Sequence, residues 1–271
     1  MKATYRDHGG TDLSVVNAAR VSFSQHSYWD YVGPMKVQTL KEKDVNLIQY
    51  LARGMPRKEW EQIIHTIIQE GHEHNSDMVS SGTKTYLYNE IQWRIEDLML
   101  MAQHWVPFTH TMVTLHMIAP VPIARQCFKH KIGFTESEES RRYITTTPTL
   151  YIPEEFRAKA KDVKQGSAGK HDLSDFWKGN YLAICRTAIE TYDKMIADGV
   201  APEQARFILP QGCEVEWIWT GNIASYARYV NQRSDPHAQL ESQELAKQVS
   251  DIIRPLFPVS WDALVKSGRT E

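Results

Sequence analysis

The side chains best suited to chemistry lie between positions 125 and 143. This stretch holds five cations against three glutamates, with hydroxyl groups interleaved among them. The cations are Arg125, Lys129, Lys131, Arg141 and Arg142. Phosphate oxygens only accept hydrogen bonds, so cations beside hydroxyl and backbone donors suit a phosphate group. A solvated basic loop has the same composition, so the order of the residues has to decide between the two readings.

That order resembles the signature of the flavin-dependent thymidylate synthases, an Arg-His-Arg triplet followed by Ser-x-Arg-Tyr. Lys129-His130-Lys131 stands at the triplet and Ser140-Arg141-Arg142-Tyr143 at the end, after the lead-in Pro122–Gln126. Further segments match the family in the same order, namely Ala18–Ser22, His104–His110, Ala205–Pro210, Trp219–Asn222 and Arg233–Glu241. The resemblance covers residues 12 to 257 with one insertion.

The resemblance implies an enzyme that methylates deoxyuridylate (dUMP) to thymidylate (dTMP). The carbon donor would be 5,10-methylenetetrahydrofolate, and FAD reduced by NADPH would be the hydride source. The family uses no obligatory cysteine nucleophile, and nothing in the sequence marks Cys127, Cys185 or Cys213 as activated. Family members are homotetramers whose active sites are shared among subunits, so a homotetramer is expected.

Roles for individual residues follow from the same resemblance. Substrate binding is expected from Gln126, Ser140, Arg142, Arg206 and Arg233. Arg233 would contact the pyrimidine ring and stabilise negative charge on it, and it is grouped with His104 and Ser140 as catalytic. Contacts to flavin and folate are expected from Ser22, His104, Lys129, His130, Lys131, Asn222 and His237.

Local alternatives exist for single residues. Arg206 could lie on a helix surface, and Arg233 could pair with Asp235 or Glu241. His237 and Glu241 are spaced for a contact across one helical turn. His110 and His116 could line one face of a strand.

The chain departs from the family pattern near the expected flavin site. Lysines replace both arginines of the triplet, Arg228 stands at a flavin-side asparagine position, and residues 56–102 are expected to be a helical insertion. Two alternatives follow. The same scaffold could act on dCMP or make a 5-hydroxymethylpyrimidine nucleotide, or, more remotely, a non-catalytic protein could bind nucleotide or RNA.

Composition limits the class of protein. Lys and Arg total 31 against 33 Asp and Glu, which gives a net charge of −2. The chain as a whole therefore has no basic field for non-specific nucleic-acid binding. An odd number of scattered cysteines, no metal-type spacing and no long apolar run predict a cytoplasmic protein without a metal or a membrane partner.

Periodicity predicts an α+β fold, mostly helical with a modest central β-sheet, in a single catalytic domain over 1–271. Strand character is expected for Thr111–Ala119, and Lys159–Asp172 is expected to be a mobile loop. A helix is expected from Asp12 to Val21, with Asp12 or Ser14 as its N-cap. Other helices are expected at 44–53, 60–70, 89–103, from 122, at 176–198, 202–209, 222–231 and 238–256.

Overall fold

The computed structural model describes residues 1–54, 62, 65, 104–160 and 166–265. The chain forms two compact units, which are described separately. The first unit comprises residues 1–7, 113–221 and 229–252, and the second comprises 8–112, 222–228 and 253–271. The helices predicted at 60–70 and 89–103, and almost all of the predicted insertion, lie outside the described residues.

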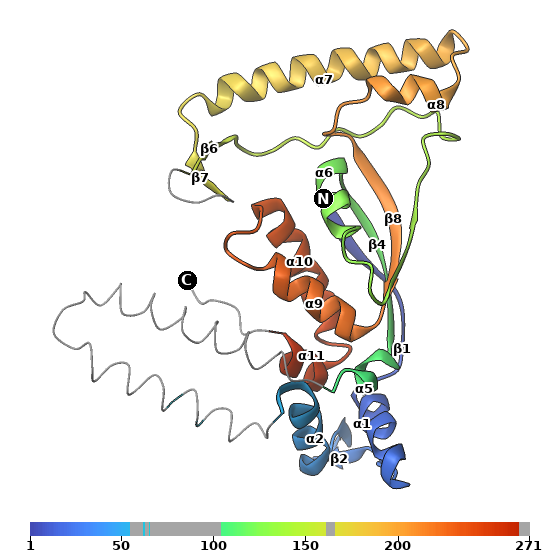
Figure 1. Ribbon diagram of the computed structural model, residues 1–271, viewed down its shortest axis with the longest axis vertical. Helices are drawn as coiled ribbons and strands as arrows, with labels where there is room; N and C mark the ends of the chain where they lie inside the picture. The colour runs from blue at the N-terminus through green and yellow to red at the C-terminus, as the bar shows by residue number, and fades with distance from the viewer. Residues whose placement is uncertain (55–61, 63–64, 66–103, 161–165, 266–271) are drawn as a thin grey trace, which may run out of the picture. The chain divides into compact units, whose positions relative to one another are not determined.

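A four-stranded sheet in the order β1-β4-β8-β5 forms the centre of the first unit. Its strands are β1 (Lys2–Gly9), β4 (Met112–Pro120), β5 (Phe134–Glu138) and β8 (Glu214–Gly221). Strand β8 pairs antiparallel with both β4 and β5. Figure 1 shows β4 and β8 side by side. Alternate β4 residues, from Val113 to Ala119, are fully buried, as expected for a strand with one core face. The strand predicted at 111–119 is confirmed.

The helices of the first unit are α6 (Val121–Cys127), α7 (Ser174–Ala197), α8 (Pro202–Ala205) and α10 (Leu240–Ile253), with the end of α9 (Ile223–Arg233). A short 3-10 helix, η2 (Arg206–Ile208), follows α8. The helix predicted at 176–198 is confirmed as α7. The apolar face of α7 is only partly buried. Cys185 and Tyr192 are buried, whereas Trp177 is 48% and Ile184 is 70% exposed.

Two short strands pair as a hairpin within the stretch where a loop was predicted. Strand β6 (Arg157–Lys159) pairs antiparallel with β7 (Ser167–Lys170), with a register shift between Arg157 and Lys159. The loop prediction was therefore wrong for 167–170. These residues are small or polar and all are exposed, so they lack the apolar alternation that marks a strand in a sequence.

The second unit is built from α1 (Asp12–Arg20), α2 (Glu42–Arg53), α5 (Val106–Thr109), α11 (Pro258–Leu264) and the start of α9. It also holds the 3-10 helix η1 (Val21–Phe23) and a hairpin of β2 (Asp30–Val32) and β3 (Val37–Thr39). The helix predicted at 44–53 is confirmed, and it ends at Gly54, where φ is +74°.

The predicted N-cap of α1 was wrong. Thr11 is the N-cap, and its backbone N–H donates to Ser14 Oγ at 3.0 Å, as in a capping box. The Asp12 carboxylate instead accepts the N–H groups of Val259 and Ser260, both at 2.9 Å. Asp12 therefore caps α11, which begins more than 240 residues later.

Among the described residues more lie in helices than in strands, and the largest sheet has four strands, which is consistent with the predicted α+β class. None of the helices in the described part of the chain is long and apolar enough to cross a membrane.

Candidate functional site

Three of the predicted site residues meet where α6 faces the end of α9. The Arg233 guanidinium donates from Nε to His130 Nε2 at 3.1 Å and from Nη1 to Gln126 Oε1 at 3.2 Å. It also donates from Nη2 to the Gln126 backbone carbonyl at 3.0 Å. These contacts define the arginine group of Gln126, His130 and Arg233, which lies wholly within the first unit.

These hydrogen bonds fix the chemical state of their partners. Arginine can only donate, so His130 Nε2 must accept, and the neutral imidazole carries its proton on Nδ1. The same reasoning orients the Gln126 amide, whose oxygen faces Arg233. A guanidinium has five N–H groups, and these three bonds use three of them. Each terminal nitrogen of Arg233 thus keeps a second N–H for an acceptor such as a carbonyl or phosphate oxygen.

Stacked aromatic rings hold the arginine group in place. Phe134 stacks on Trp219 with ring centroids 4.2 Å apart, and Trp219 meets Tyr229 edge-on at 4.9 Å. Tyr229 in turn meets the His130 ring edge-on at 5.1 Å. Trp219 and Tyr229 are fully buried, so the imidazole is held against a packed core and cannot swing away from Arg233 without disturbing it.

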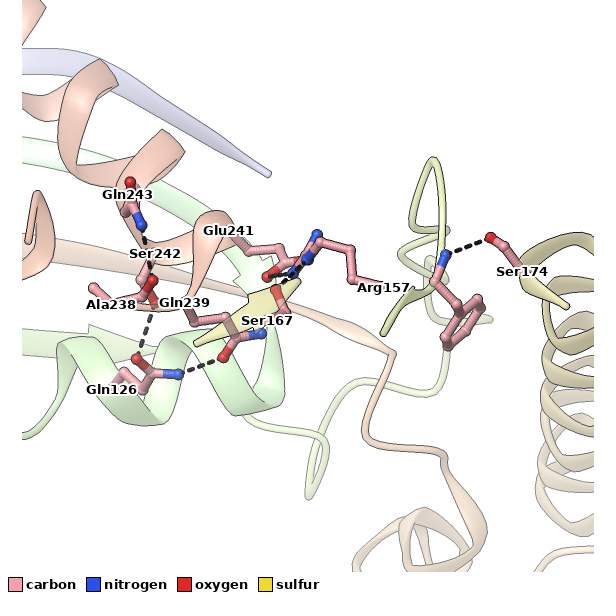
Figure 2. A network of polar contacts seen from close by, with 10 residues as sticks. Gln126, Arg157, Ser167, Ser174, Ala238, Gln239, Glu241, Ser242 and Gln243 are labelled. Carbon is pink, nitrogen blue, oxygen red and sulfur yellow. Dashed lines mark hydrogen bonds and ion pairs between the residues drawn. The ribbon is translucent and has the colours of Figure 1, made fainter. Parts of the chain in front are cut away.

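A polar network extends from Gln126 to the start of α10. Gln126 Nε2 donates to Gln239 Oε1 at 2.8 Å, and Ser242 Oγ donates to Gln126 Oε1 at 2.9 Å. Figure 2 shows these contacts next to the ion pair between Arg157 and Glu241. The Gln126 amide is therefore held from both sides, by Arg233 and by α10.

A second cationic group surrounds Glu203 on α8. Arg142 Nε lies 3.6 Å from the Glu203 carboxylate, and Arg206 Nε donates to the Glu203 backbone carbonyl at 3.3 Å. Ser140 Oγ accepts the N–H of Arg142 at 3.4 Å. We call Ser140, Arg142 and Arg206 the phosphate-type group. Arg142 and Glu203 are both more than half exposed, so their ion pair is weak.

The other predicted site residues of the first unit have exposed side chains. Lys129 and Lys131 are exposed on either side of the buried His130, and Lys131 forms an ion pair with Glu136. His237 is exposed in the segment between α9 and α10, where its N–H donates to Asp235 Oδ1 at 2.7 Å.

Ser22, His104 and Asn222 belong to the second unit. Ser22 is exposed in η1, and the exposed His104 ring stacks on Tyr50 with centroids 6.0 Å apart. Asn222 Oδ1 accepts hydrogen bonds from the backbone N–H and the hydroxyl of Ser225, at 2.9 and 3.0 Å. Asn222 therefore caps the start of α9.

Two local alternatives from the sequence are wrong. Arg233 pairs with neither Asp235 nor Glu241, because its three bonds go to Gln126 and His130. Glu241 is bound by Arg157, and His237 precedes α10, so the two do not share a helical turn. His116 does lie on β4, where Nε2 meets Glu216 at 2.8 Å.

Sequence reasoning missed the partners of these groups. Three of these partners lie within or beside segments that match the family pattern, so their positions could have marked them as site residues; they are Glu203, Gln239 and Ser242. Arg157 lies in a polar stretch with no motif, and the sequence offers no signal for it.

The cysteines are unsuited to nucleophilic attack at neutral pH. Burial raises the pKa of the Cys127 thiol to about 11, and a hydrogen bond with Tyr229 and the charge of Arg233 offset this only in part. Burial likewise raises the pKa of Cys213 to about 11. Thiolate is the reactive form, so neither residue is activated.

Comparisons with known proteins agree on one family. The family model described as "Thymidylate synthase complementing protein" matches residues 55–259. A flavin-dependent thymidylate synthase of Thermosipho africanus is 34% identical over 167 residues, which covers 60% of this chain and 72% of the relative. One from Thermotoga neapolitana is 29% identical over 258 residues, covering 95% and 87%.

A solved structure has the same fold. The UMP/dUMP methylase PolB from Streptomyces cacaoi, bound with 5-Br dUMP, superposes with a TM-score of 0.64 at 21% identity. The match covers 99% of this chain and 96% of that one.

Proposed function

Because the chain belongs to the flavin-dependent thymidylate synthase family, we propose that it methylates dUMP to dTMP. The carbon donor is 5,10-methylenetetrahydrofolate, and the hydride source is FAD reduced by NADPH. The observation that carries this proposal is the arginine group, because Gln126, His130 and Arg233 come from two separate signature segments and meet through three hydrogen bonds.

Arg233 acts on the pyrimidine ring. Its remaining N–H groups donate to a uracil carbonyl oxygen, which gains negative charge as ring carbon 5 becomes nucleophilic. Because Gln126 and His130 already hold the guanidinium, little reorganisation is needed when that charge develops. This is a way to activate the ring without a cysteine adduct, in keeping with the raised pKa of the Cys127 thiol.

The phosphate-type group binds the 5′-phosphate of the nucleotide. The guanidinium groups of Arg142 and Arg206 flank Glu203, and Ser140 adds a hydroxyl beside Arg142. A phosphate dianion offers more acceptor oxygens than the Glu203 carboxylate, so it competes well for Arg142. Arg206 binds the Glu203 backbone carbonyl through Nε, and its terminal nitrogens can donate to the same phosphate.

Each active site is shared between copies of the chain in a homotetramer. Arg233 bonds to Gln126 and His130, whereas Arg142 and Arg206 both bind Glu203, so one chain carries two half-sites with different partners. In a symmetric pair, the arginine group of one copy can meet the phosphate-type group of the other, and the reverse. The exposed apolar side chains on α7 and η2 support association, among them Trp177, Ile184 and Phe207.

Exposed cationic and polar side chains of this chain suit a flavin dinucleotide. The diphosphate of FAD needs cations, and Lys129 and Lys131 are exposed beside the signature histidine. Ser22 and His104 present exposed polar side chains for the ring system. When bound, FAD supplies the hydride chemistry that no side chain can perform. The residues of this chain bind, orient and neutralise charge.

Absorption spectroscopy and a product assay test the proposal together. Purified protein reconstituted with FAD is expected to be yellow and to convert dUMP to dTMP with methylenetetrahydrofolate and NADPH. Parallel reactions with UMP and dCMP, read by mass spectrometry, also detect a hydroxymethyl product. A protein that retains no FAD and yields no methylated nucleotide would overturn the proposal.

A further inference from the structure

An ion pair joins the β6–β7 hairpin to the first turn of α10. Arg157 Nη2 donates to both carboxylate oxygens of Glu241, at 2.7 and 2.8 Å, and Arg157 Nε donates to Ser167 Oγ at 2.7 Å. Glu241 is only 8% exposed. A carboxylate buried to this degree needs its cation, because an unpaired charge is costly in a low-dielectric setting.

The residues on either side of Glu241 face the arginine group. Ser242, the next residue, donates to Gln126 Oε1 at 2.9 Å, and Gln239 accepts from Gln126 Nε2 at 2.8 Å. The Gln239 carbonyl also accepts the backbone N–H groups of Ser242 and Gln243, so this short turn is one hydrogen-bonded piece. Figure 2 shows Arg157 on one side of that turn and Gln126 on the other.

The hairpin also lies against the segment that leads into α10. A side chain added at Gly166 would come within 4.0 Å of the His237 carbonyl oxygen. The residue that precedes β7 therefore lies close to the α9–α10 connection. The Arg157–Glu241 ion pair is thus the direct tie between this hairpin and the first turn of α10.

We propose that Arg157 is a positioning residue for nucleotide binding: by holding Glu241, it fixes Gln239 and Ser242, and through Gln126 it orients Arg233. This rests on the proposed function, in which Arg233 contacts the pyrimidine. The Gln126 amide has to present its oxygen to Arg233 and its nitrogen to Gln239 at the same time. If the α10 turn shifts, one of these contacts is lost and the guanidinium is no longer held in one orientation.

The carboxyl of Glu241 behaves as this role requires. Burial alone would raise its pKa, but hydrogen bonds, with those from Arg157 foremost, lower the pKa below its ordinary value. The group is thus ionised at neutral pH and bound to Arg157.

The test compares dUMP binding by calorimetry in the full-length, FAD-loaded protein and three variants. Arg157→Met is expected to weaken dUMP binding on the order of tenfold, because a guanidinium that is no longer held in one orientation binds the pyrimidine less well. Arg157→Lys keeps the charge opposite Glu241 without the planar fork, so it should restore part of the loss.

Lys170→Met is the matched control. Lys170 lies opposite Arg157 in the hairpin register, and its ammonium group pairs with the exposed Asp175 at 3.4 Å. It should bind dUMP within about twofold of the unaltered protein, because an exposed pair contributes little. The flavin absorption spectrum should be unchanged in all variants, since none alters an expected flavin contact.

The outcomes separate this inference from the proposed function. Equal dUMP affinity and an equal KM in Arg157→Met, even with a lower melting temperature, would leave a purely structural role and overturn the inference. If Arg157→Met fails to fold, unchanged dUMP affinity in both Arg157→Lys and Ser167→Ala would overturn it equally. Unaltered protein that binds dUMP but forms no dTMP would overturn the proposed reaction alone, and one that binds no dUMP would overturn both.

Discussion

Replacing Arg233 with alanine removes three hydrogen bonds at once. Gln126 Oε1 keeps a donor, Ser242 Oγ, but the Gln126 backbone carbonyl and His130 Nε2 lose theirs. A buried acceptor left without a donor costs about 1–3 kcal/mol. Because Arg233 is partly exposed, water can reach part of the space, so we take the lower end for each acceptor. The free energy of unfolding should then fall by about 2 kcal/mol.

The effect on catalysis should be much larger than the effect on stability. A fall of about 2 kcal/mol corresponds to a melting temperature lower by about 4–8 °C, which leaves the protein folded at 25 °C. Loss of one preorganised donor to a developing anion typically lowers turnover by about 10²–10³-fold. Because Arg233 supplies a charge as well as donors, dTMP formation in Arg233→Ala should fall below detection.

The assay pairs dTMP formation with thermal melting monitored by circular dichroism. Lys247→Ala is the control, since this exposed lysine pairs with Asp251 on the surface of α10 at 2.7 Å and should change neither readout. Arg233→Lys keeps the charge without the planar guanidinium. Its melting temperature should lie between those of the unaltered protein and Arg233→Ala, and its dTMP formation should stay strongly impaired. Turnover in Arg233→Ala close to that of the unaltered protein would refute the reasoning.

Further expected outcomes concern a thiol, two carboxylates and the phosphate-type group. Cys127→Ala should keep most dTMP formation and lose about 1 kcal/mol of stability, because the thiol is buried and un-ionised. A variant that binds FAD normally but forms no dTMP would refute the cysteine-independent route. The lowered pKa of Glu241 contributes stability that is full at neutral pH and is lost as pH falls below about 4.3. In urea titrations, Glu241→Gln should therefore lose less stability between pH 7 and pH 3 than the unaltered protein, and equal losses would contradict this. Arg142→Ala should raise the KM for dUMP with little change in melting temperature, since its pair with Glu203 is exposed; an unchanged KM would remove Arg142 from the phosphate site. Asp12→Ala should destabilise the protein by about 1–2 kcal/mol without changing the KM, as expected for the loss of a helix cap; a stability equal to the unaltered protein would count against the cap.

Local sequence pattern was sufficient to predict the helices and strands that have a regular apolar period. The helix α7 and the strand β4 lie close to where spacing predicts them, because each carries apolar residues at a regular period. The helix stops just before Gly199, which has a positive φ, and the strand ends at Pro120. Local pattern failed where distant residues decide the structure. Asp12 is a good N-cap by type, yet its carboxylate bonds to the start of α11, and Thr11 caps α1 instead.

The site residues likewise divide into those that the sequence pattern predicted and those that it could not. Order within the signature led to Gln126, His130 and Arg233, and the structure brings them together through hydrogen bonds. Arg157 could not be found, because its role depends on a hairpin with no apolar alternation and on a partner 84 positions away. The roles expected for Ser22, His104 and Asn222 at a flavin stay predictions.

Mixing two impaired variants tests most directly whether one nucleotide site is built from two copies of the chain. Arg233→Ala lacks the arginine group and Arg142→Ala weakens the phosphate-type group, so each variant alone should form little dTMP at low dUMP. After co-unfolding and reassembly in equal amounts, about a quarter of the sites should combine both intact groups, as random pairing across a shared interface requires. Recovery of dTMP formation to about that fraction is the expected result. Activity in the mixture no higher than the mean of the two variants would contradict the shared site.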